Sequence, residues 1–337
     1  MITQSGLVRG LGIVAIAASI VGCGTQPEIS ETVSDSPSVV VTNSVLCDVT
    51  EKIAQETVDL TCLVEPGMDL HTYEPSPSDR QAIETADLVL YGGYNLEPKI
   101  VRLIDSTTTP GTKVAVYETA VANPLMTSDH HDHGEEEHGH DHEHEEEEAA
   151  AGELTPDPHV WHNAQNGAKI VETVAKELEA IAPENAEQYQ TQAATMATRL
   201  TELDNWIKAQ IDTIPANQRQ LITTHDAFGY YSEAYNLPAQ GLQGLSTESR
   251  PTAFKVKELV ETIEKAGVPT VFRESTTNPS ALKTVANEAK VQIAEEPLYT
   301  SGLGTKENPL ESYEQMLITN TETIVKGLGG NYTEFQP

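Results

Sequence analysis

The chain has 337 residues, with 52 acidic and 20 basic side chains and a formal net charge of −32 at pH 7. A surface this acidic repels nucleic acid and anionic lipid and attracts cations, which excludes a DNA- or RNA-binding protein. The length predicts two domains, with one large domain as the alternative. The apolar fraction, 38% of the chain, is low because a polar run and the leader distort it, and ordinary apolar patterning is found outside them.

The N-terminus is predicted to be a lipoprotein signal peptide followed by a flexible tether. A short positive start precedes an apolar stretch, residues 11–22, that is too short to span a bilayer comfortably. The stretch ends in Ile-Val-Gly-Cys, which resembles a bacterial lipobox with Cys23 as the acylated residue. We assign residues 1–22 to the signal peptide and residues 23–37, rich in Ser, Thr, Glu and Pro, to the tether. The acyl chains would anchor an extracytoplasmic protein to membrane lipid; an ordinary secretory leader is the alternative.

Two further cysteines, Cys47 and Cys62, are predicted to form a disulfide. An exported compartment is oxidising, and a spacing of fifteen residues permits one bridge. Two buried free thiols are the first alternative. Zinc ligation is the second, although this spacing fits no zinc finger and both cysteines lie in apolar patterns.

The first part of the chain alternates strands and helices. Short connections between strand, helix and strand predict a parallel βαβ unit, and Asn43-Ser44 is expected to cap its helix. We assign residues 38–182 to an N-terminal α/β lobe. Its predicted elements are strands at 38–42, 58–64, 86–93 and 113–117 and helices at 45–56, 80–85 and 166–181.

A histidine-rich acidic run interrupts this lobe. Residues 129–148 hold eleven carboxylates and seven of the eleven histidines, with no Lys, Arg or apolar side chain. Such a segment buries too little apolar surface to offset its ordering entropy, so the insertion 127–154 is predicted to be disordered. Imidazoles beside carboxylates suit zinc, copper or nickel, and we interpret the run as an accessory low-affinity metal collector rather than a solvated linker. Its histidines are His130, His131, His133, His138, His140, His142 and His144.

A long helix is expected to join two lobes. After Glu184, about thirty residues contain no Gly or Pro and carry apolar residues at spacings of three and four, which predicts a helix about 45 Å long. Because an α/β pattern resumes afterwards, we assign 183–213 to a rigid linker helix and 214–330 to a C-terminal α/β lobe. The predicted elements of that lobe are strands at 220–224, 241–245, 270–274 and 292–294 and helices at 228–235, 252–266, 279–289 and 313–326.

Four histidines lie outside the run. Three of them, His71, His159 and His225, directly follow a predicted strand or precede a helix. Ligands of open α/β sheets bind at the carboxyl ends of the strands, so we expect these three to meet between the lobes and bind a metal ion. The fourth, His162, is expected to face solvent, with a place behind the metal ligands as the alternative.

Several motifs resemble the zinc/manganese solute-binding proteins of bacterial ABC transporters, over residues 38–330. The motifs are DLHTYEPSPSD, DPHVWHN, TTHDAFGYY, GLQGLST, VFRESTT and LYTSGLG. The resemblance implies two Rossmann-like lobes with parallel sheets, one rigid joining helix, and a metal held in the cleft by His71, His159 and His225. It also implies delivery of the metal to an ABC permease and its ATPase, and we expect a monomer. Members that prefer manganese usually have Glu in place of His225, so this chain resembles the zinc-preferring or dual members.

The identity of the fourth ligand is open. The family usually places an Asp in a loop resembling LYSDALG, whereas LYTSGLG puts Ser301 at that position. A serine hydroxyl is a poor zinc ligand, so water, Glu274 or a histidine of the run is expected to complete the site. Glu274 resembles a family position near the metal, where it would orient an imidazole from outside the ligand set. Asp69 and Glu74 are expected to cap the backbone or form salt bridges.

These features predict high-affinity extracytoplasmic capture of Zn²⁺ for uptake by a transporter. A protein for Mn²⁺, or for both ions, is the alternative, although manganese prefers oxygen donors and binds less tightly. A zinc hydrolase would use the same three ligands and a water, but the sequence contains no HExxH or G-x-S-x-G motif, so we do not expect an enzyme. A surface metal buffer or adhesin without a transport role is a third possibility.

Overall fold

A computed structural model describes residues 36–128, 154–304 and 310–336. The predicted signal peptide, Cys23, nearly all of the tether and the histidine-rich run lie outside these residues. The described residues belong to one compact unit, Ser36–Pro337. Among the helices described, none combines the length and the apolar character needed to cross a bilayer.

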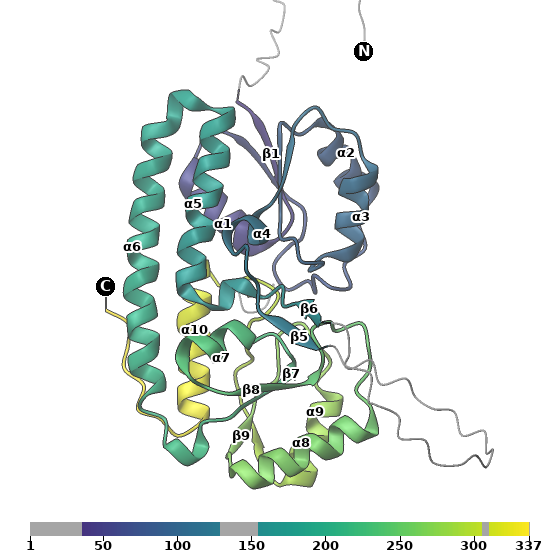
Figure 1. Cartoon of the computed structure of the whole chain (residues 1–337), viewed down its shortest axis with the longest axis vertical. Helices are drawn as coiled ribbons and strands as arrows, with labels where there is room; N and C mark the ends of the chain where they lie inside the picture. Colours follow the sequence, from purple (N-terminus) through teal and green to yellow (C-terminus); the bar gives the residue numbers. More distant parts are fainter. Residues whose placement is uncertain (1–35, 129–153, 305–309, 337) are drawn as a thin grey trace, which may run out of the picture. The chain divides into compact units, whose positions relative to one another are not determined.

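The N-terminal lobe is built on a four-stranded parallel sheet (Figure 1). Its central strand β1 is an almost continuous run of buried valines, which is typical of a parallel strand covered on both faces. Helix α1 (Ser44–Ala54) follows at once, because the Asn43 side chain accepts a hydrogen bond from the Leu46 N–H at 3.1 Å and caps the first turn. The predicted parallel βαβ unit is thus confirmed. In the order of pairing, the strands are β2 (Asp59–Cys62), β1 (Ser38–Val41), β3 (Leu88–Tyr91) and β4 (Thr112–Ala115).

Helix α2 (Pro77–Thr85) begins three residues earlier than predicted. Ser76 and Asp79 form a reciprocal capping box there, and proline occupies the first helical position. Helices α3 (Pro98–Ser106) and α4 (Val116–Ala120) were not predicted from the sequence. Both are short, with only two buried residues each, which leaves too little of the helical period to detect.

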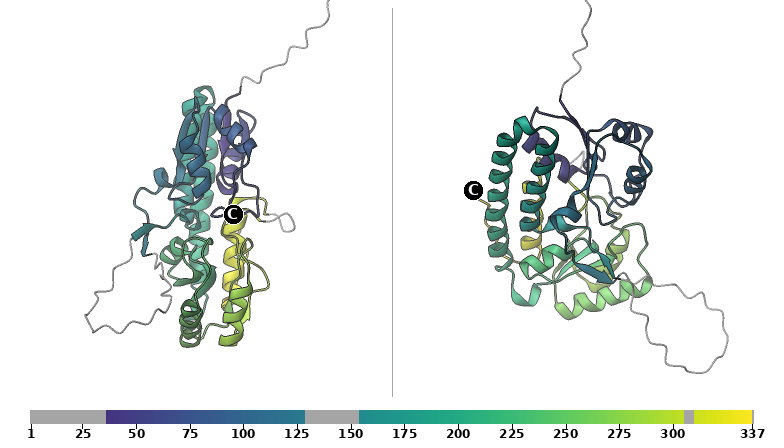
Figure 2. Two further views of the ribbon diagram at one scale, coloured as in Figure 1. Left: turned by 90° about the vertical axis from the view of Figure 1, so that its right-hand side faces the viewer. Right: turned by 45° about the horizontal axis from the view of Figure 1, so that its top comes forward.

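Two antiparallel helices form one side of the unit. Helix α5 (Ala164–Ile181) turns through the 3₁₀ segment η2 (Pro183–Asn185) into the 26-residue helix α6 (Ala186–Ile211). Figure 2 shows α5 and α6 side by side, and Figure 1 shows α6 continuing alongside α10 in the other lobe. The buried stripe that includes Tyr189, Leu200 and Ile211 faces these neighbours. The long helix expected to join the lobes is therefore present.

The C-terminal lobe repeats the parallel arrangement, with two strands of five residues and two strands of two residues. Strand β7 (Leu221–His225) is buried along its whole length, and the Phe272 N–H donates to the Ile222 carbonyl at 2.8 Å, which places β9 beside β7. The lobe therefore has two two-stranded parallel sheets, β7 with β8 and β9 with β10, which this bond links. The 3₁₀ turn η3 (Ala216–Gln218) precedes β7, and the remaining elements are α7 (Gly229–Tyr235), β8 (Ala239–Gln243), α8 (Ala253–Ala266), β9 (Thr270–Val271), α9 (Ser280–Ala289), β10 (Gln292–Ile293) and α10 (Tyr313–Gly327).

A short antiparallel hairpin, absent from the sequence prediction, closes the base of the histidine-rich insertion. Strand β5 (Met126–Ser128) pairs with β6 (Leu154–Pro156). Residues 127, 128 and 154, which were predicted to belong to the disordered insertion 127–154, therefore lie in strands, and residues 129–153 lie outside the described residues. Pairing across such a long gap in the sequence leaves no local signal.

The disulfide predicted from the sequence joins the first helix to the sheet. Cys47 on α1 is bonded to Cys62 at the end of β2, with their Cα atoms 6.0 Å apart. This bridge closes a loop of fifteen residues that contains the whole α1–β2 connection. The two alternatives considered for these cysteines, buried free thiols and zinc ligation, are therefore excluded.

Candidate metal centre

Two of the three candidate histidines are held by the same local turn. Asp69 Oδ1 accepts a hydrogen bond from the His71 N–H at 3.0 Å, and Asp157 Oδ1 accepts one from the His159 N–H at 2.9 Å. Aspartate side chains favour this turn because they hydrogen-bond the backbone two residues further on. The first turn lies in the loop between β2 and α2. The second lies between β6 and η1 (Val160–His162), just before α5.

The third histidine comes from the other lobe. His225 is the last residue of β7, so it lies at the carboxyl end of a parallel strand. Strand β8 passes so close that a Cβ atom on Gly241 would lie 2.3 Å from the carbonyl carbon of His225. A glycine is therefore required at position 241, because any side chain there would clash with the backbone of His225.

The three imidazoles converge on one point. Nε2 of His159 lies 3.2 Å from Nε2 of His71 and 3.4 Å from Nε2 of His225, and one ligand atom from each residue falls within 4.8 Å of the others. Tetrahedral Zn–N bonds of about 2.0–2.1 Å place neighbouring nitrogens about 3.3 Å apart. All three rings are buried. In the part of the chain that the structure describes, this is the single cluster of His, Cys, Asp and Glu side chains with such geometry.

Buried carboxylates hold the outer nitrogens of two of these rings. Asp157 Oδ1 lies 2.9 Å from Nδ1 of His159. Glu274 binds Nδ1 of His225 with one oxygen and accepts the His225 N–H at 2.9 Å with the other. Such partners fix the tautomer and turn Nε2 toward the metal position. Glu274 lies behind His225, as its expected orienting role requires.

The electrostatics of the three rings differ. Burial, with a smaller contribution from the His225 charge, lowers the pKa of His71 to about 3, and burial also lowers the pKa of His159 well below 6.5. Burial alone would lower the pKa of His225 as well, but attraction to the Glu274 carboxylate outweighs it and the pKa is raised. His71 and His159 are therefore neutral donors at pH 7, whereas His225 keeps its proton to a higher pH than an ordinary imidazole, and a metal ion competes with that proton.

The other candidate residues have defined partners. Ser301 is buried, and its Oγ lies 3.3 Å from Thr276 Oγ1. It follows Thr300, whose hydroxyl donates to Glu274 at 3.3 Å. Glu74 forms a salt bridge to Lys99, and Asp69 Oδ2 accepts a hydrogen bond from Thr247 of the C-terminal lobe at 2.6 Å. The histidines of the run lie outside the described residues.

The expectation that His162 faces solvent is wrong. Its side chain is fully buried and stacks on Phe228, with ring centroids 4.6 Å apart. It lies in η1, whose three residues are all buried beneath the start of α5. Sequence alone does not reveal this burial, because one 3₁₀ turn has no apolar periodicity.

The buried His162 is expected to make folding pH-dependent. Burial lowers its pKa to about 3, so the folded chain keeps it neutral while the unfolded chain protonates it below about 6.5. Stability should therefore fall as pH drops from 6.5 toward 3, and His162→Phe should reduce the slope by about 1.4 kcal/mol per pH unit. Urea unfolding of the metal-free protein between pH 4 and 7 measures this slope.

A second substitution separates titration from packing. His162→Gln also removes the titrating group but does not restore the aromatic stack, so its stability at pH 7 will differ from that of His162→Phe. Both variants should nevertheless show the same change of slope. A wild-type slope in either variant contradicts the titration of His162.

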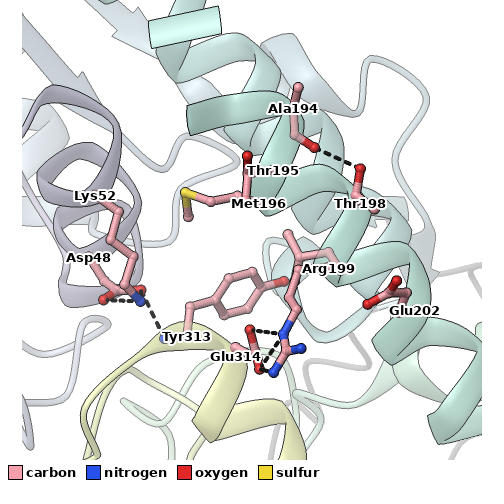
Figure 3. A pocket seen from close by; sticks show the side chains of 11 residues that line it. Asp48, Lys52, Ala194, Thr195, Met196, Thr198, Arg199, Glu202, Tyr313 and Glu314 are labelled. Atoms are coloured by element: carbon pink, nitrogen blue, oxygen red, sulfur yellow. Dashed lines mark hydrogen bonds and ion pairs between the residues drawn. The ribbon is translucent and has the colours of Figure 1, made fainter. Parts of the chain in front are cut away.

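A cavity of about 660 Å³ lies between α1, α6 and α10, and none of the three histidines lines it (Figure 3). Its charged side chains pair with one another. Lys52 binds Asp48 at 2.8 Å, and Arg199 binds both carboxylate oxygens of Glu314. Asp48 also accepts the Tyr313 N–H at 3.0 Å. These contacts join the N-terminal lobe, the long helix and the C-terminal lobe, and the cavity presents no set of metal ligands.

Missing from the sequence prediction was the role of Asp157. Its position two residues before His159 repeats the spacing of Asp69 and His71, and this Asp-x-His repeat is the signal that could have identified it. Gly229 leaves room for this aspartate, because a Cβ atom at position 229 would lie 2.4 Å from Asp157 Oδ2.

Two parallel α/β lobes, joined by a long helix and contributing converging imidazoles, define a two-lobed metal-binding protein. The chain belongs to the family ZnuA, described as "Zinc-uptake complex component A periplasmic", which it matches over residues 39–327. The family resemblance read from the motifs is thereby confirmed. The protein is a substrate-binding component of a metal ABC transporter, and the family comprises transport components rather than enzymes.

Two bacterial lipoproteins are similar to this chain over nearly its whole length. The manganese-binding lipoprotein MntA of Halalkalibacterium halodurans is 32% identical over 316 residues, covering 94% of this chain and 96% of the relative. The manganese ABC transporter substrate-binding lipoprotein PsaA of Streptococcus pneumoniae is 30% identical, with the same coverage. Among solved structures, the periplasmic zinc-binding protein TroA of Treponema pallidum has a TM-score of 0.75 at 30% identity, covering 87% of this chain and 99% of TroA.

Proposed function

We propose that the protein captures Zn²⁺ outside the cytoplasm with His71, His159 and His225 and delivers it to a membrane permease driven by an ATPase. The observation that carries the choice of zinc is the donor set. Three imidazole nitrogens converge, and the two nearby carboxylates, Asp157 and Glu274, are bound to the outer ring nitrogens. Asp157 Oδ1 and both oxygens of Glu274 are bound by these histidines.

This donor chemistry favours zinc over manganese. Neutral imidazoles suit Zn²⁺, whereas Mn²⁺ prefers oxygen ligands and lies lowest in the general affinity order of these ions. Water is expected at the fourth position, because Ser301 replaces a carboxylate by a weak hydroxyl donor. Two relatives are named for manganese, so Mn²⁺ is the second candidate cargo.

The location we propose is the outer face of a membrane. Two relatives are named as lipoproteins, which supports acylation at Cys23 and a lipid anchor. The histidine-rich run at 129–148 then serves as a low-affinity collector that raises the local concentration of metal. Its carboxylates and imidazoles suit weak, exchangeable binding.

A direct competition experiment tests the choice of metal. The protein lacking residues 129–148 is loaded with Zn²⁺ or Mn²⁺ and titrated with the other ion, and bound metal is measured by elemental analysis. We expect one tightly bound Zn²⁺ per chain that a hundredfold excess of Mn²⁺ does not displace. Stoichiometric replacement of zinc by manganese would assign the site to Mn²⁺.

Ser301→Asp is expected to shift this selectivity toward manganese. The substitution supplies a carboxylate oxygen in the loop next to Thr300 and Glu274, and oxygen donors favour Mn²⁺. We expect Mn²⁺ affinity to rise by about tenfold or more, an increase of about 1.4 kcal/mol in binding free energy. Calorimetric titration with each ion measures both affinities.

Ser301→Asn is the matched control for this prediction. Asparagine has nearly the same size as aspartate but lacks the negative charge, so it should raise Mn²⁺ affinity much less. Equal effects of the two substitutions would show that loop packing, rather than the added carboxylate, changes the selectivity.

A further inference from the structure

A hydrogen bond beside His71 joins the two lobes. Asp69, in the loop between β2 and α2, accepts the His71 N–H with Oδ1 at 3.0 Å and the Thr247 hydroxyl with Oδ2 at 2.6 Å. Thr247 belongs to the C-terminal lobe, in the loop that follows β8, and both Asp69 and Thr247 are half-buried. One carboxylate therefore holds the turn that carries His71 and also fastens that turn to the opposite lobe.

The loop that carries Thr247 is anchored opposite the third histidine. This loop, residues 244–250, follows Gln243, which pairs with His225 across the two strands β8 and β7. Nε2 of Gln243 donates to the carbonyl of Thr247 at 3.3 Å and also to the carbonyl of Ser249. The position of the Thr247 hydroxyl is thus fixed by the residue that lies across from His225.

These contacts connect a histidine of each lobe without passing through the metal position. The connection runs from His71 through Asp69, Thr247 and Gln243 to the strand position of His225. The three rings of the site are buried, with exposed fractions of 3% or less. An ion can therefore reach their nitrogens, or leave them, only when a segment around them moves.

The lobes are also joined on the side of the second histidine, but there the contact is buried. The Tyr230 hydroxyl of α7 donates to the carbonyl of Asp157 at 3.2 Å and accepts the Leu125 N–H at 3.0 Å. The Tyr230 side chain is buried, unlike Asp69 and Thr247. Hydrogen bonds close to solvent open more readily than those in a packed core. Separation of the lobes should therefore begin at the contact between Asp69 and Thr247.

We propose that the hydrogen bond between Thr247 and Asp69 is a latch between the lobes, which opens before an ion enters or leaves the three-histidine site. This inference rests on the proposed function. Thr247 is not a metal ligand, so the latch controls the rates of ion entry and release more than the affinity. When the bond breaks, the turn that carries His71 loses this attachment to the C-terminal lobe and can move away from it.

The kinetics of zinc exchange test the latch. Thr247→Val keeps the size of the side chain and removes the hydroxyl donor, whereas Thr247→Ser keeps the donor. Both are made in protein lacking residues 129–148, and Zn²⁺ entry and release are followed by stopped flow with a fluorescent chelator. We expect Thr247→Val to raise both rates by about tenfold, as loss of a hydrogen bond to a carboxylate implies. Its zinc affinity should stay within about threefold of wild type, because both rates rise together, and Thr247→Ser should exchange zinc within about twofold of the wild-type rates.

A second substitution tests the other end of the latch. Gln243→Leu removes the amide that holds the loop of Thr247 and should also raise both rates. Thr284→Val is the matched control in the same lobe, because the Thr284 hydroxyl donates to the Ser280 carbonyl of its own helix, α9, at 3.4 Å. This control should exchange zinc at the wild-type rates.

The outcomes separate this inference from the proposed function. Wild-type rates in Thr247→Val overturn the latch. Faster release with an unchanged rate of entry also overturns it, because the hydroxyl would then only stabilise the bound state. Equally fast exchange in Thr247→Ser or Thr284→Val would assign the effect to packing and likewise overturn it. Failure of the wild-type protein to bind zinc would instead refute the proposed function.

Discussion

His225→Ala is expected to weaken Zn²⁺ binding by more than about 100-fold. Loss of a residue that only orients a metal ligand typically lowers metal affinity by about 10–100-fold, and this substitution removes a ligand itself. The measurement is calorimetry with a competing chelator, made on protein that lacks residues 129–148. That deletion is needed because the seven histidines of the run offer other donors for zinc.

His225→Gln provides the control for the fold. Its amide can still donate a hydrogen bond to Glu274, but it has no imidazole nitrogen for the metal. We expect the same loss of affinity as in His225→Ala. The free energy of unfolding should be higher for His225→Gln, because His225→Ala removes the imidazole that binds the buried Glu274 carboxylate. Unchanged zinc affinity in both variants would refute the three-histidine site.

Glu274→Gln is expected to lower zinc affinity by about 10–100-fold, although Glu274 does not face the metal position. Glu274 accepts hydrogen bonds from the backbone N–H and Nδ1 of His225 and from the Thr300 hydroxyl. A glutamine has only one acceptor oxygen, so its amide group must face one of these donors. The His225 ring then loses part of its orientation and its electrostatic support.

The pH profile distinguishes this orienting role from simple loss of structure. In the wild type, metal competes with the His225 proton, so zinc affinity falls as pH drops through the raised pKa of His225. Removing the Glu274 charge lowers that pKa, and the fall in affinity should begin at a lower pH. Thr300→Val removes only one hydroxyl donor and should change the profile little. A uniform loss at every pH would assign Glu274 a structural role alone.

The features that could be predicted from the sequence are those with a local signal. The long helix α6 was evident because 26 residues show a helical stripe without Gly or Pro. His71, His159 and His225 were recognisable because each was expected to follow a strand or precede a helix, although the structure places His71 in the middle of the loop between β2 and α2. The pairing of Met126 with Pro156 had no such signal, since its strands are separated by the whole run. The burial of His162 depends on Phe228, which is distant in the sequence and belongs to the other lobe.

The turns that hold His71 and His159 could be predicted from the sequence only in part. Asp69 was expected to cap the backbone, and it does, whereas the equivalent role of Asp157 went unrecognised. The two aspartates have the same spacing to their histidines, so the pattern was present in the sequence. What the sequence could not indicate was the second bond of Asp157 to the ring of His159, because that contact depends on the side-chain conformation in the folded site.

The origin of the three histidines has a consequence for release of the ion. His71 and His159 belong to one lobe, while His225, together with its partner Glu274, belongs to the other. A small separation of the lobes would therefore carry His225 and Glu274 away from His71 and His159. An ion held by the proposed three-histidine site would then keep two of its protein ligands and lose the third in one step.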